Sequence, residues 1–492
     1  MSDIKKYLGV DLGAESGRVF IGTLADGKLT VEEAHRFANG YVVINGRMRW
    51  DTFKLFGEIK TGLKKAIAKC GGYADGIGID TWGVDFGLFD ENGDISTMPY
   101  QYRDPKFIGA SEEAFKIVGR EEMFEKIGIQ TMDINTIFQL WRMKQLNPAS
   151  LKNAKKLLFM PDIFNYWLTG VMKTEYSIAS TSQMLDVHKK DWAYDILERL
   201  GIPTEMLPEI NMNGQVLGTI TDEIKEELGA KNNIPVYSIG EHDTASAVLS
   251  VPSDKENFCF ISCGTWSLMG MELDKPLVTE ASCEANYTNE GGAFGTIRFL
   301  KNITGLWIIQ ECRRYWEAEG KTIDYGEITA RAAACEGFKS LINPNNQIFV
   351  QAGNMIPKIQ NYCKETSQPV PEGIGEIIRC GNDSLALAYR QVVDNLEELT
   401  GKEISQIHMV GGGTKNVLLS KLTANVTGKT VVTGPIEGTV IGNLLMQALG
   451  EGVVKDIAEA RQIVRNSEPI NVIKPDPAFN CDEVYEKFVK LP

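Results

Sequence analysis

The N-terminal part of the chain alternates short apolar runs with turn signals, a pattern typical of closely spaced β-strands. A buried strand is predicted from Tyr7, and it leads into a glycine- and serine-rich turn that ends at Arg18. Two more strands are predicted over 29–37 and 41–50, and an Asn-Gly pair inside the latter predicts a tight hairpin. Because the first strands are too closely spaced for helical crossovers, we expect a mixed sheet.

Longer segments then follow helical spacing. Apolar residues over 51–69 predict an amphipathic helix with Asp51 as its N-cap. A strand, an interruption and a second strand are predicted over 76–90, and the order β-β-β-α-β is typical of an α/β layer domain. Helical patterns dominate 105–200, where we expect a helical insertion on the first sheet. The helices predicted there cover 111–127, 136–146 and 161–169.

The second half repeats the arrangement of the first. An apolar strand beginning at Asn257 runs into the small-residue turn at 263–265. A strand followed by such a turn in both halves is what a duplicated nucleotide-binding fold shows. The other predicted elements are strands over 235–240 and 404–410, helices over 381–399 and 438–450, and a glycine turn over 411–413.

The length of the chain sets the number of domains. A chain of 492 residues that is 43 % hydrophobic can form more than one core, and single cores seldom grow past about 250–300 residues. We therefore predict two large domains, over 1–245 and 246–465, with a C-terminal tail over 466–492.

The net charge of the chain limits the kinds of partner that it can bind. The chain has 51 Lys+Arg against 65 Asp+Glu, and its net charge of −14 argues against a nucleic-acid or anionic-membrane surface. It has no apolar run of about 18 residues and no apolar signal-peptide core at its start, so we expect a cytoplasmic protein. The nine cysteines fit reduced thiols, although Cys363 and Cys380 could be bridged.

The turn after the first strand is the first candidate for chemistry. Its backbone N–H groups, the hydroxyl of Ser16 and the cation of Arg18 can converge on a phosphate, and Asp11 before it can hold Mg²⁺ through water. An ordinary N-terminal hairpin is the other interpretation, and the stretch alone does not decide between them.

Common phosphate-binding motifs are absent elsewhere. Both Gly-Lys-Thr sites lack the glycine that a Walker loop requires five residues earlier, since Tyr315 and Thr423 stand there. No Gly-x-Gly-x-x-Gly fingerprint follows the first strand. The glycine turns therefore indicate a different ATP fold.

Several motifs occur in a fixed order along nearly the whole chain. They are Asp11-Leu12-Gly13-Ala14 with Ser16-Gly17-Arg18, Ile79-Asp80-Thr81-Trp82-Gly83-Val84-Asp85, Met160-Pro161-Asp162 with Leu168-Thr169-Gly170, Gly240-Glu241-His242-Asp243-Thr244-Ala245-Ser246, Gly264-Thr265-Trp266-Ser267 and Gly411-Gly412-Gly413. In this order they resemble the FGGY family of sugar kinases. The resemblance implies an α/β protein with two actin/hexokinase-like (ribonuclease H-like) ATPase domains, mixed sheets and a helical insertion in the first domain.

The resemblance also implies an activity and a site. We expect transfer of the γ-phosphate of ATP to a ketose held with ATP in a cleft between the domains, with Asp243 as the base and Mg²⁺ held by Asp11, through water. The expected phosphate and nucleotide contacts are Ala14, Glu15, Ser16, Gly17, Arg18, Thr265, Gln310 and Gly412. The expected sugar contacts are Gly83, His242, Asp243, Thr244 and Asn302. The partners would be ketose and ATP only, with the chain a monomer or a small homo-oligomer.

Other interpretations stay open at this point. Asp243 is also a sound helix N-cap, Gln310 a core-facing glutamine, Gly412 a plain turn residue and Trp82 a core aromatic. L-Rhamnulose is the favoured sugar, with fuculose, xylulose and glycerol as alternatives. A non-catalytic actin-fold ATP-binding protein is the alternative from another class.

Overall fold

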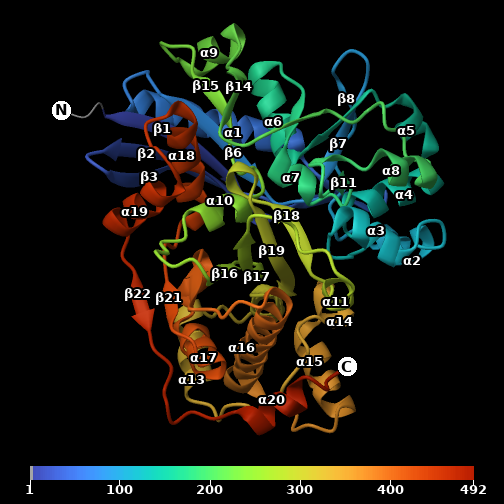
Figure 1. The fold of residues 1–492 in the computed structure, drawn as a ribbon, viewed down its shortest axis with the longest axis vertical. Coiled ribbons are helices and arrows are strands. Elements are labelled where there is room, and N and C mark those ends of the chain that lie inside the picture. Colours follow the sequence, from blue (N-terminus) through green and yellow to red (C-terminus); the bar gives the residue numbers. More distant parts are fainter. Residues whose placement is uncertain (1–3) are drawn as a thin grey trace. The chain divides into compact units, whose positions relative to one another are not determined.

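The computed structural model describes residues 4–492, which form two compact units (Figure 1). Unit 1 comprises the chain up to Ser250 together with 272–299 and 438–468, and unit 2 comprises 251–271, 300–437 and 469–492. Each predicted domain is one continuous stretch of sequence. Each unit of the structure instead combines segments that lie far apart along the chain.

The main sheet of unit 1 has six strands. They are β1 (Lys5–Leu12), β2 (Ser16–Ala25), β3 (Lys28–Ala38), β6 (Gly76–Thr81), β14 (Gln215–Thr219) and β15 (Pro235–Ser238). Their order is β14-β15-β6-β1-β2-β3, with β1, β2 and β3 antiparallel and β1 parallel to β6. The predicted mixed sheet is confirmed.

Helices cover both faces of this sheet. They are α1 (Thr52–Lys69), α6 (Met160–Thr169), α9 (Asp222–Leu228), α10 (Asp243–Leu249), α18 (Gly438–Glu451) and α19 (Ile457–Ser467). On one face, Leu8 and Val10 share a core with α1, and on the other, Tyr7 shares a core with α18 and α19. Alternate residues of β1 therefore face opposite layers, as the pleat of a strand requires.

The predicted N-cap of α1 is confirmed, since the Asp51 side chain accepts a hydrogen bond from the backbone N of Lys54. The small-residue helix α18 packs closely on α10. A Cβ atom at Gly442 would lie 1.7 Å from the backbone oxygen of Ser246, so no larger residue fits there. This close approach of the two helices explains why small residues occur in the helix predicted over 438–450.

The helical insertion has its own core. Its elements are β7 (Phe86–Phe89), β8 (Ile95–Thr97), η1 (Pro105–Phe107), α2 (Ala110–Ala114), α3 (Arg120–Ile127), α4 (Thr136–Leu146), α5 (Pro148–Asn153), β9 (Lys156–Phe159), β10 (Lys173–Glu175), α7 (Tyr176–Ser180), β11 (Leu185–Asp186), β12 (Asp191–Trp192), α8 (Tyr194–Leu200) and β13 (Glu209–Asn211). The single helix predicted over 111–127 is wrong, because the extended backbone of Gly119 separates α2 from α3.

Five short elements complete unit 1. The predicted hairpin is formed by β4 (Tyr41–Ile44) and β5 (Arg47–Trp50), and the others are α11 (Glu280–Glu284), β18 (Thr288–Gly291) and η2 (Ala293–Gly295). The Asn-Gly turn of the hairpin has positive φ angles of 51° and 71°, as its sequence predicts.

Unit 2 is built on a second mixed sheet. Its elements are β16 (Phe258–Cys263), β17 (Trp266–Leu273), β19 (Ile297–Thr304), α12 (Trp307–Ala318), α13 (Tyr325–Ala333), α14 (Gln347–Val350), α15 (Met355–Glu365), α16 (Gly373–Thr400), β20 (Gln406–Val410), η3 (Gly412–Lys415), α17 (Val417–Thr427), β21 (Val431–Thr433), β22 (Asn471–Ile473) and α20 (Asp482–Phe488). The sheet order is β18-β19-β17-β16-β20-β21-β22, and the chain passes from unit 1 into unit 2 within β19.

Two further findings concern residues 4–492. None of the helices there is long and apolar enough to cross a membrane. All nine cysteines are free, Cys363 and Cys380 included.

The helix predicted over 381–399 begins earlier, at Gly373, because Ile377 and Ile378 bury their side chains in the core of unit 2.

Candidate active site

The ends of two neighbouring strands bring two carboxyl groups together in unit 1. β1 pairs with β6 so that Asp11 stands opposite Asp80, and both side chains are buried. Burial, followed by the charge of Asp11, raises the pKa of Asp80 well above its usual value. On the other side, Arg18 stands opposite Asp11 on β2 and forms an ion pair with it. Two acids and one cation therefore meet at this edge of the sheet.

The turn between β1 and β2 is closed and anchored. The backbone N of Gly13 donates to the oxygen of Ser16 at 2.9 Å. Asn39, at the end of β3, donates from its backbone N to the oxygen of Glu15 at 2.9 Å and from Nδ2 to the oxygen of Gly13 at 2.8 Å. The hairpin interpretation and the phosphate interpretation of this stretch are compatible, because a hairpin carries the turn. Asn39 was not predicted, since nothing in its local sequence indicates that partner.

Glycine is required at the start of β2, next to this turn. A Cβ atom at Gly17 would lie 2.2 Å from the Phe37 ring. Ala14 is half-buried and Glu15 is exposed, so the outer side of the turn faces solvent in unit 1. The turn thus keeps a fixed shape from within while its tip stays accessible.

The second turn, after β6, holds a strained residue. Val84 has a φ of 66°, which is rare for a β-branched residue. Its backbone N donates to Thr181 Oγ1 at 3.0 Å, and its oxygen accepts from Thr136 Oγ1 at 2.7 Å. A Cβ atom at the preceding Gly83 would lie 3.0 Å from Thr181. Backbone strain of this kind is typical of ligand-binding sites, and here it lies next to Gly83, which was predicted to contact the sugar.

Asp85, which ends the motif around this turn, binds the side chains of two tryptophans. Its Oδ2 accepts hydrogen bonds from Trp50 Nε1 at 2.6 Å and Trp82 Nε1 at 3.0 Å. The two indole rings lie 4.2 Å apart. Trp82 is buried, which confirms its interpretation as a core aromatic. Sequence reasoning missed Asp85 as an anchor, although an acid directly before an apolar strand can signal a buried polar network.

The central motif lies beside the end of β6. The backbone N of Thr81 donates to the oxygen of Glu241 at 2.9 Å, and Thr81 forms a bridge with His242. α10 begins at Asp243, and His242 occupies the N-cap position. The N-cap interpretation of Asp243 is therefore wrong by one residue. Asp243 Oδ1 instead accepts from Thr244 Oγ1 at 3.1 Å.

Asp243 has the electrostatics of a base. Burial raises its pKa, His242 opposes the rise, and the charge of Asp11 adds to it. Its side chain is still 36 % exposed in unit 1, so a ligand can reach it. A carboxylate with a raised pKa and an accessible face is suited to take a proton from a hydroxyl group.

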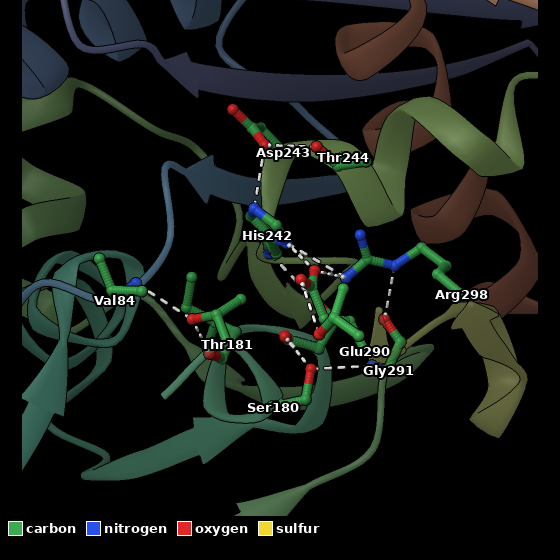
Figure 2. Close-up of polar contacts among 12 residues, drawn as sticks. Val84, Ser180, Thr181, His242, Asp243, Thr244, Glu290, Gly291 and Arg298 are labelled. Carbon is green, nitrogen blue, oxygen red and sulfur yellow. Dashed lines mark hydrogen bonds and ion pairs between the residues drawn. The ribbon is translucent and has the colours of Figure 1, made fainter. Parts of the chain in front are cut away.

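His242 is held by two residues that the sequence did not single out (Figure 2). Its Nδ1 lies 3.1 Å from Arg298 Nη2 and 3.3 Å from Glu290 Oε2. Its Nε2 lies 3.4 Å from Asp243 Oδ1. A lone arginine within the apolar strand around Ile297 was the available signal, because arginine is almost never fully buried unless paired.

The other predicted residues belong to unit 2. Thr265 lies between β16 and β17, and its oxygen accepts from the backbone N of Trp307 at 3.0 Å. A Cβ atom at Gly413 would lie 2.2 Å from Cys263 Sγ, whereas one at Gly412 would meet open space. The glycine turn therefore packs directly against the end of β16 and leaves Gly412 facing outward.

Gln310 and Asn302 complete the set in unit 2. Gln310 lies on α12, and its Oε1 is buried with no hydrogen-bond partner within residues 4–492. A buried amide oxygen without a partner is costly, which fits a ligand contact better than a core position. Asn302 lies on β19 and is half-buried.

The acids at the β1–β6 edge suit a magnesium ion that keeps its water. Over residues 4–492, no cluster of three or more His, Cys, Asp or Glu residues could hold a metal. Mg²⁺ is commonly bound through one or two carboxylates, substrate phosphates and several waters rather than by a cage of protein ligands. Asp11 beside Asp80 fits that donor set.

Comparison with known proteins shows the family of the chain. Residues 6–250 match the N-terminal domain, and residues 259–451 the C-terminal domain, of the FGGY family of carbohydrate kinases. A rhamnulokinase of Bacteroides thetaiotaomicron is 43 % identical over 98 % of this chain and 99 % of its own length. A rhamnulokinase of Oceanobacillus iheyensis is 41 % identical over 94 % of this chain and 96 % of its own length.

Solved structures match the fold at low identity. The xylulose kinase of Lactobacillus acidophilus aligns with a TM-score of 0.79 at 17 % identity, over 99 % of this chain and 96 % of that one. The xylulose kinase of Rhodospirillum rubrum gives 0.79 at 18 %, over 99 % and 98 %. The expected α/β architecture with two actin/hexokinase-like domains is confirmed.

Proposed function

This chain belongs to the FGGY family of carbohydrate kinases, and we propose that it transfers the γ-phosphate of ATP to the 1-hydroxyl of L-rhamnulose. The products are L-rhamnulose 1-phosphate and ADP. The observation that carries the proposal is the identity of 43 % and 41 % to two rhamnulokinases along nearly the whole chain.

Asp243 is the base in this reaction. Its carboxylate takes the proton of the attacking hydroxyl while the sugar oxygen forms a bond to the γ-phosphorus and the bond to ADP breaks. His242 and Thr244 flank the base and contact the sugar, as does the strained turn at Gly83. Asn302 is a further sugar contact. The side-chain exposure and raised pKa of Asp243 support this assignment.

The phosphates bind to turns that follow strands. Ser16 and Arg18 donate to them from the start of β2, Ala14 and Glu15 in the preceding turn and Gly17 on β2 supply backbone, and Thr265 donates from the β16–β17 turn. Gln310 contacts the nucleotide, and Gly412 leaves room for adenosine. Mg²⁺, held by Asp11 through water, would neutralise charge on the phosphates.

The remaining properties follow from the same assignment. The N-terminal domain over 1–245 supplies sugar and phosphate contacts, and the C-terminal domain over 246–465 binds the nucleotide. The protein acts in the cytoplasm, where ATP is available, as a monomer or a small homo-oligomer. Ketose and ATP are its partners, without nucleic acid or membrane.

The test is phosphate transfer from ATP to L-rhamnulose, with the phosphorylated carbon identified by ¹³C and ³¹P NMR. A coupled assay for ADP then compares L-rhamnulose with L-fuculose, xylulose and glycerol under identical conditions. The highest kcat/KM is expected for L-rhamnulose, with phosphate on carbon 1. A higher kcat/KM for another substrate would assign that substrate instead. Tight ATP binding without ketose-dependent ADP formation would favour a non-catalytic ATP-binding protein.

A further inference from the structure

We propose that Arg298 is a positioning residue that holds the neutral His242 ring in the tautomer with its proton on Nε2, facing Asp243, and that Glu290 is the counter-ion of Arg298. The inference deepens the proposed function, because it assigns the chemical state of a side chain at the sugar contact. His242, Glu290 and Arg298 all belong to unit 1.

The position of Arg298 is fixed by three contacts (Figure 2). Nε donates to the backbone oxygen of Gly291 at 2.8 Å, and Nη2 forms a hydrogen bond with His242 Nδ1 at 3.1 Å. Nη2 also lies 3.2 Å from Glu290 Oε2. The side chain has no exposed surface. A planar guanidinium held on two sides has little freedom to turn away from the imidazole.

These contacts decide the tautomer of His242. A guanidinium only donates hydrogen bonds, so the nitrogen that accepts from Arg298 must carry a lone pair. That nitrogen is Nδ1, and the single proton of the neutral ring is therefore on Nε2. Nε2 lies 3.4 Å from Asp243 Oδ1, so the proton points toward the base.

Glu290 favours a proton on Nδ1 instead, so its effect must be compared with that of Arg298. Its Oε2 lies 3.3 Å from Nδ1, at ion-pair distance, and a carboxylate there would accept a proton from Nδ1. The same oxygen lies 3.2 Å from Arg298 Nη2, which is permanently charged. Because the carboxylate is compensated by the guanidinium, it does not determine which ring nitrogen carries the proton.

The other charged groups near His242 do not change the comparison between Glu290 and Arg298. Its backbone N donates to Ser177 Oγ, which in turn donates to Glu175, so that acid faces the backbone rather than the ring. Glu241 precedes it and accepts from Asn165 Nδ2 at 2.9 Å. Asp80, on the adjacent β6, accepts from an asparagine on α18.

The state of His242 affects Asp243. A protonated imidazole would pair with the carboxylate and lower the pKa of Asp243, which is the direction of the charge effect of His242 on that group. The neutral ring with its proton on Nε2 can instead donate to an oxygen of the ketose. Arg298 thus acts through His242, on the sugar and on the base together.

The tautomer can be observed without any substrate. The chain has four histidines, so ¹⁵N-histidine labelling gives few signals, and the His242→Gln variant assigns those of His242. We expect a protonated Nε2 and an unprotonated Nδ1 at neutral pH in the parent. Arg298→Gln should shift the ring toward a mixture of tautomers. A parent spectrum with Nδ1 protonated, or an unchanged ring in Arg298→Gln, would overturn the proposal.

Kinetics separate positioning from folding. Arg298→Gln and the near-isosteric Glu290→Gln should each lower kcat for the ketose about 10- to 100-fold, with KM for ATP within about twofold. Arg331→Gln, at an exposed ion pair on α13, is the matched control and should keep the parental rate. In a His242→Gln background, Arg298→Gln should add less than about threefold, and full additivity would contradict the role. Because the NMR result needs no turnover, it stands or falls separately from the proposed reaction.

Discussion

Asn443 donates a hydrogen bond of 2.7 Å from Nδ2 to Asp80 Oδ2, although 363 positions separate the two residues. The same Nδ2 lies 3.1 Å from the oxygen of Gly78, on the same strand. Through this amide, α18 holds the acid at the end of β6 in place. A buried carboxyl group needs such partners, because burial alone strongly disfavours its charged form.

Replacing Asn443 should therefore weaken unit 1. Asn443→Ala removes the amide and leaves Asp80 and the Gly78 oxygen with one partner fewer, which costs about 1–3 kcal/mol of unfolding free energy. The midpoint of urea unfolding, followed by tryptophan fluorescence, measures the loss. Asn395→Ala, at a partly exposed position of α16 in unit 2, is the control and should change the midpoint little. Equal midpoints for the two variants would show that the Asp80 contact is dispensable.

The strained turn at Val84 depends on one hydroxyl group. Thr181→Val keeps the shape of the side chain but removes the acceptor of the Val84 backbone N. The loss of a partner for a buried N–H group costs about 1–3 kcal/mol, and the turn beside Gly83 should relax. We expect KM for the ketose to rise about tenfold or more, while KM for ATP stays near the parental value.

A helix threonine in unit 2 provides the control for this change. Thr423 is buried on α17 and donates from Oγ1 to the oxygen of Leu419, as Thr181 does to that of Ile178. Within residues 4–492 no backbone N–H donates to the Thr423 hydroxyl as that of Val84 does to Thr181. Thr423→Val should leave both KM values unchanged. If Thr181→Val bound the ketose as the parent does, the strained turn would have no part in sugar binding.

The features that depend only on nearby residues were predicted from the sequence. The N-cap at Asp51 and the hairpin of β4 and β5 follow from nearest neighbours along the chain, so pattern alone predicted them. The contacts of Asp80 with Asn443 and of Arg298 with His242 join distant segments, and no local pattern indicates such pairs. The sequence therefore predicted a set of candidate acids and turns, but not the residues that hold them in place.

Buried carboxyl groups should make stability fall as pH rises. Burial raises the pKa of Asp162 to about 7, and it raises that of the neighbouring Glu241 well above its usual value. An acid whose folded pKa exceeds its unfolded value of about 4 binds its proton more tightly in the native state. It contributes stability that is complete below about pH 4 and is lost as pH rises through about 7.

The Asp162→Asn variant tests that sign. It removes one of the titrating groups, so between pH 4 and 7 the unfolding free energy should depend less on pH, by up to about 1.4 kcal/mol per pH unit. Urea unfolding at several pH values gives the slope. Glu226→Gln, at an exposed position of α9, should leave the slope as it is in the parent. A slope in Asp162→Asn that matched the parent would mean that Asp162 titrates normally.

Asp11 should set the magnesium requirement. In Asp11→Asn the ion pair with Arg18 is lost and the carboxylate is no longer present to orient metal-bound water. We expect the Mg²⁺ concentration for half-maximal rate to rise about 10- to 100-fold at a fixed ATP concentration. Asp222→Asn, on the exposed first turn of α9, is the control and should titrate with Mg²⁺ like the parent. An unchanged requirement in Asp11→Asn would remove Asp11 from the metal site.

Asp243→Asn should separate binding from chemistry. Asn keeps the size of the side chain and an oxygen that accepts from Thr244 Oγ1, so α10 should begin as before. The amide cannot take a proton, and kcat should fall about 10²- to 10⁴-fold, while calorimetry finds ATP and ketose bound with near-parental affinity.

The pH profile of the parent gives an independent check. Because the pKa of Asp243 is raised, kcat should decline with falling pH from a higher pH than an ordinary aspartate would give. Asp243→Asn should lose that limb of the profile in its residual rate. Near-parental turnover in the variant, or the same acid limb, would assign the proton to another group, and Asp80 at the adjacent strand end would be the next candidate to test.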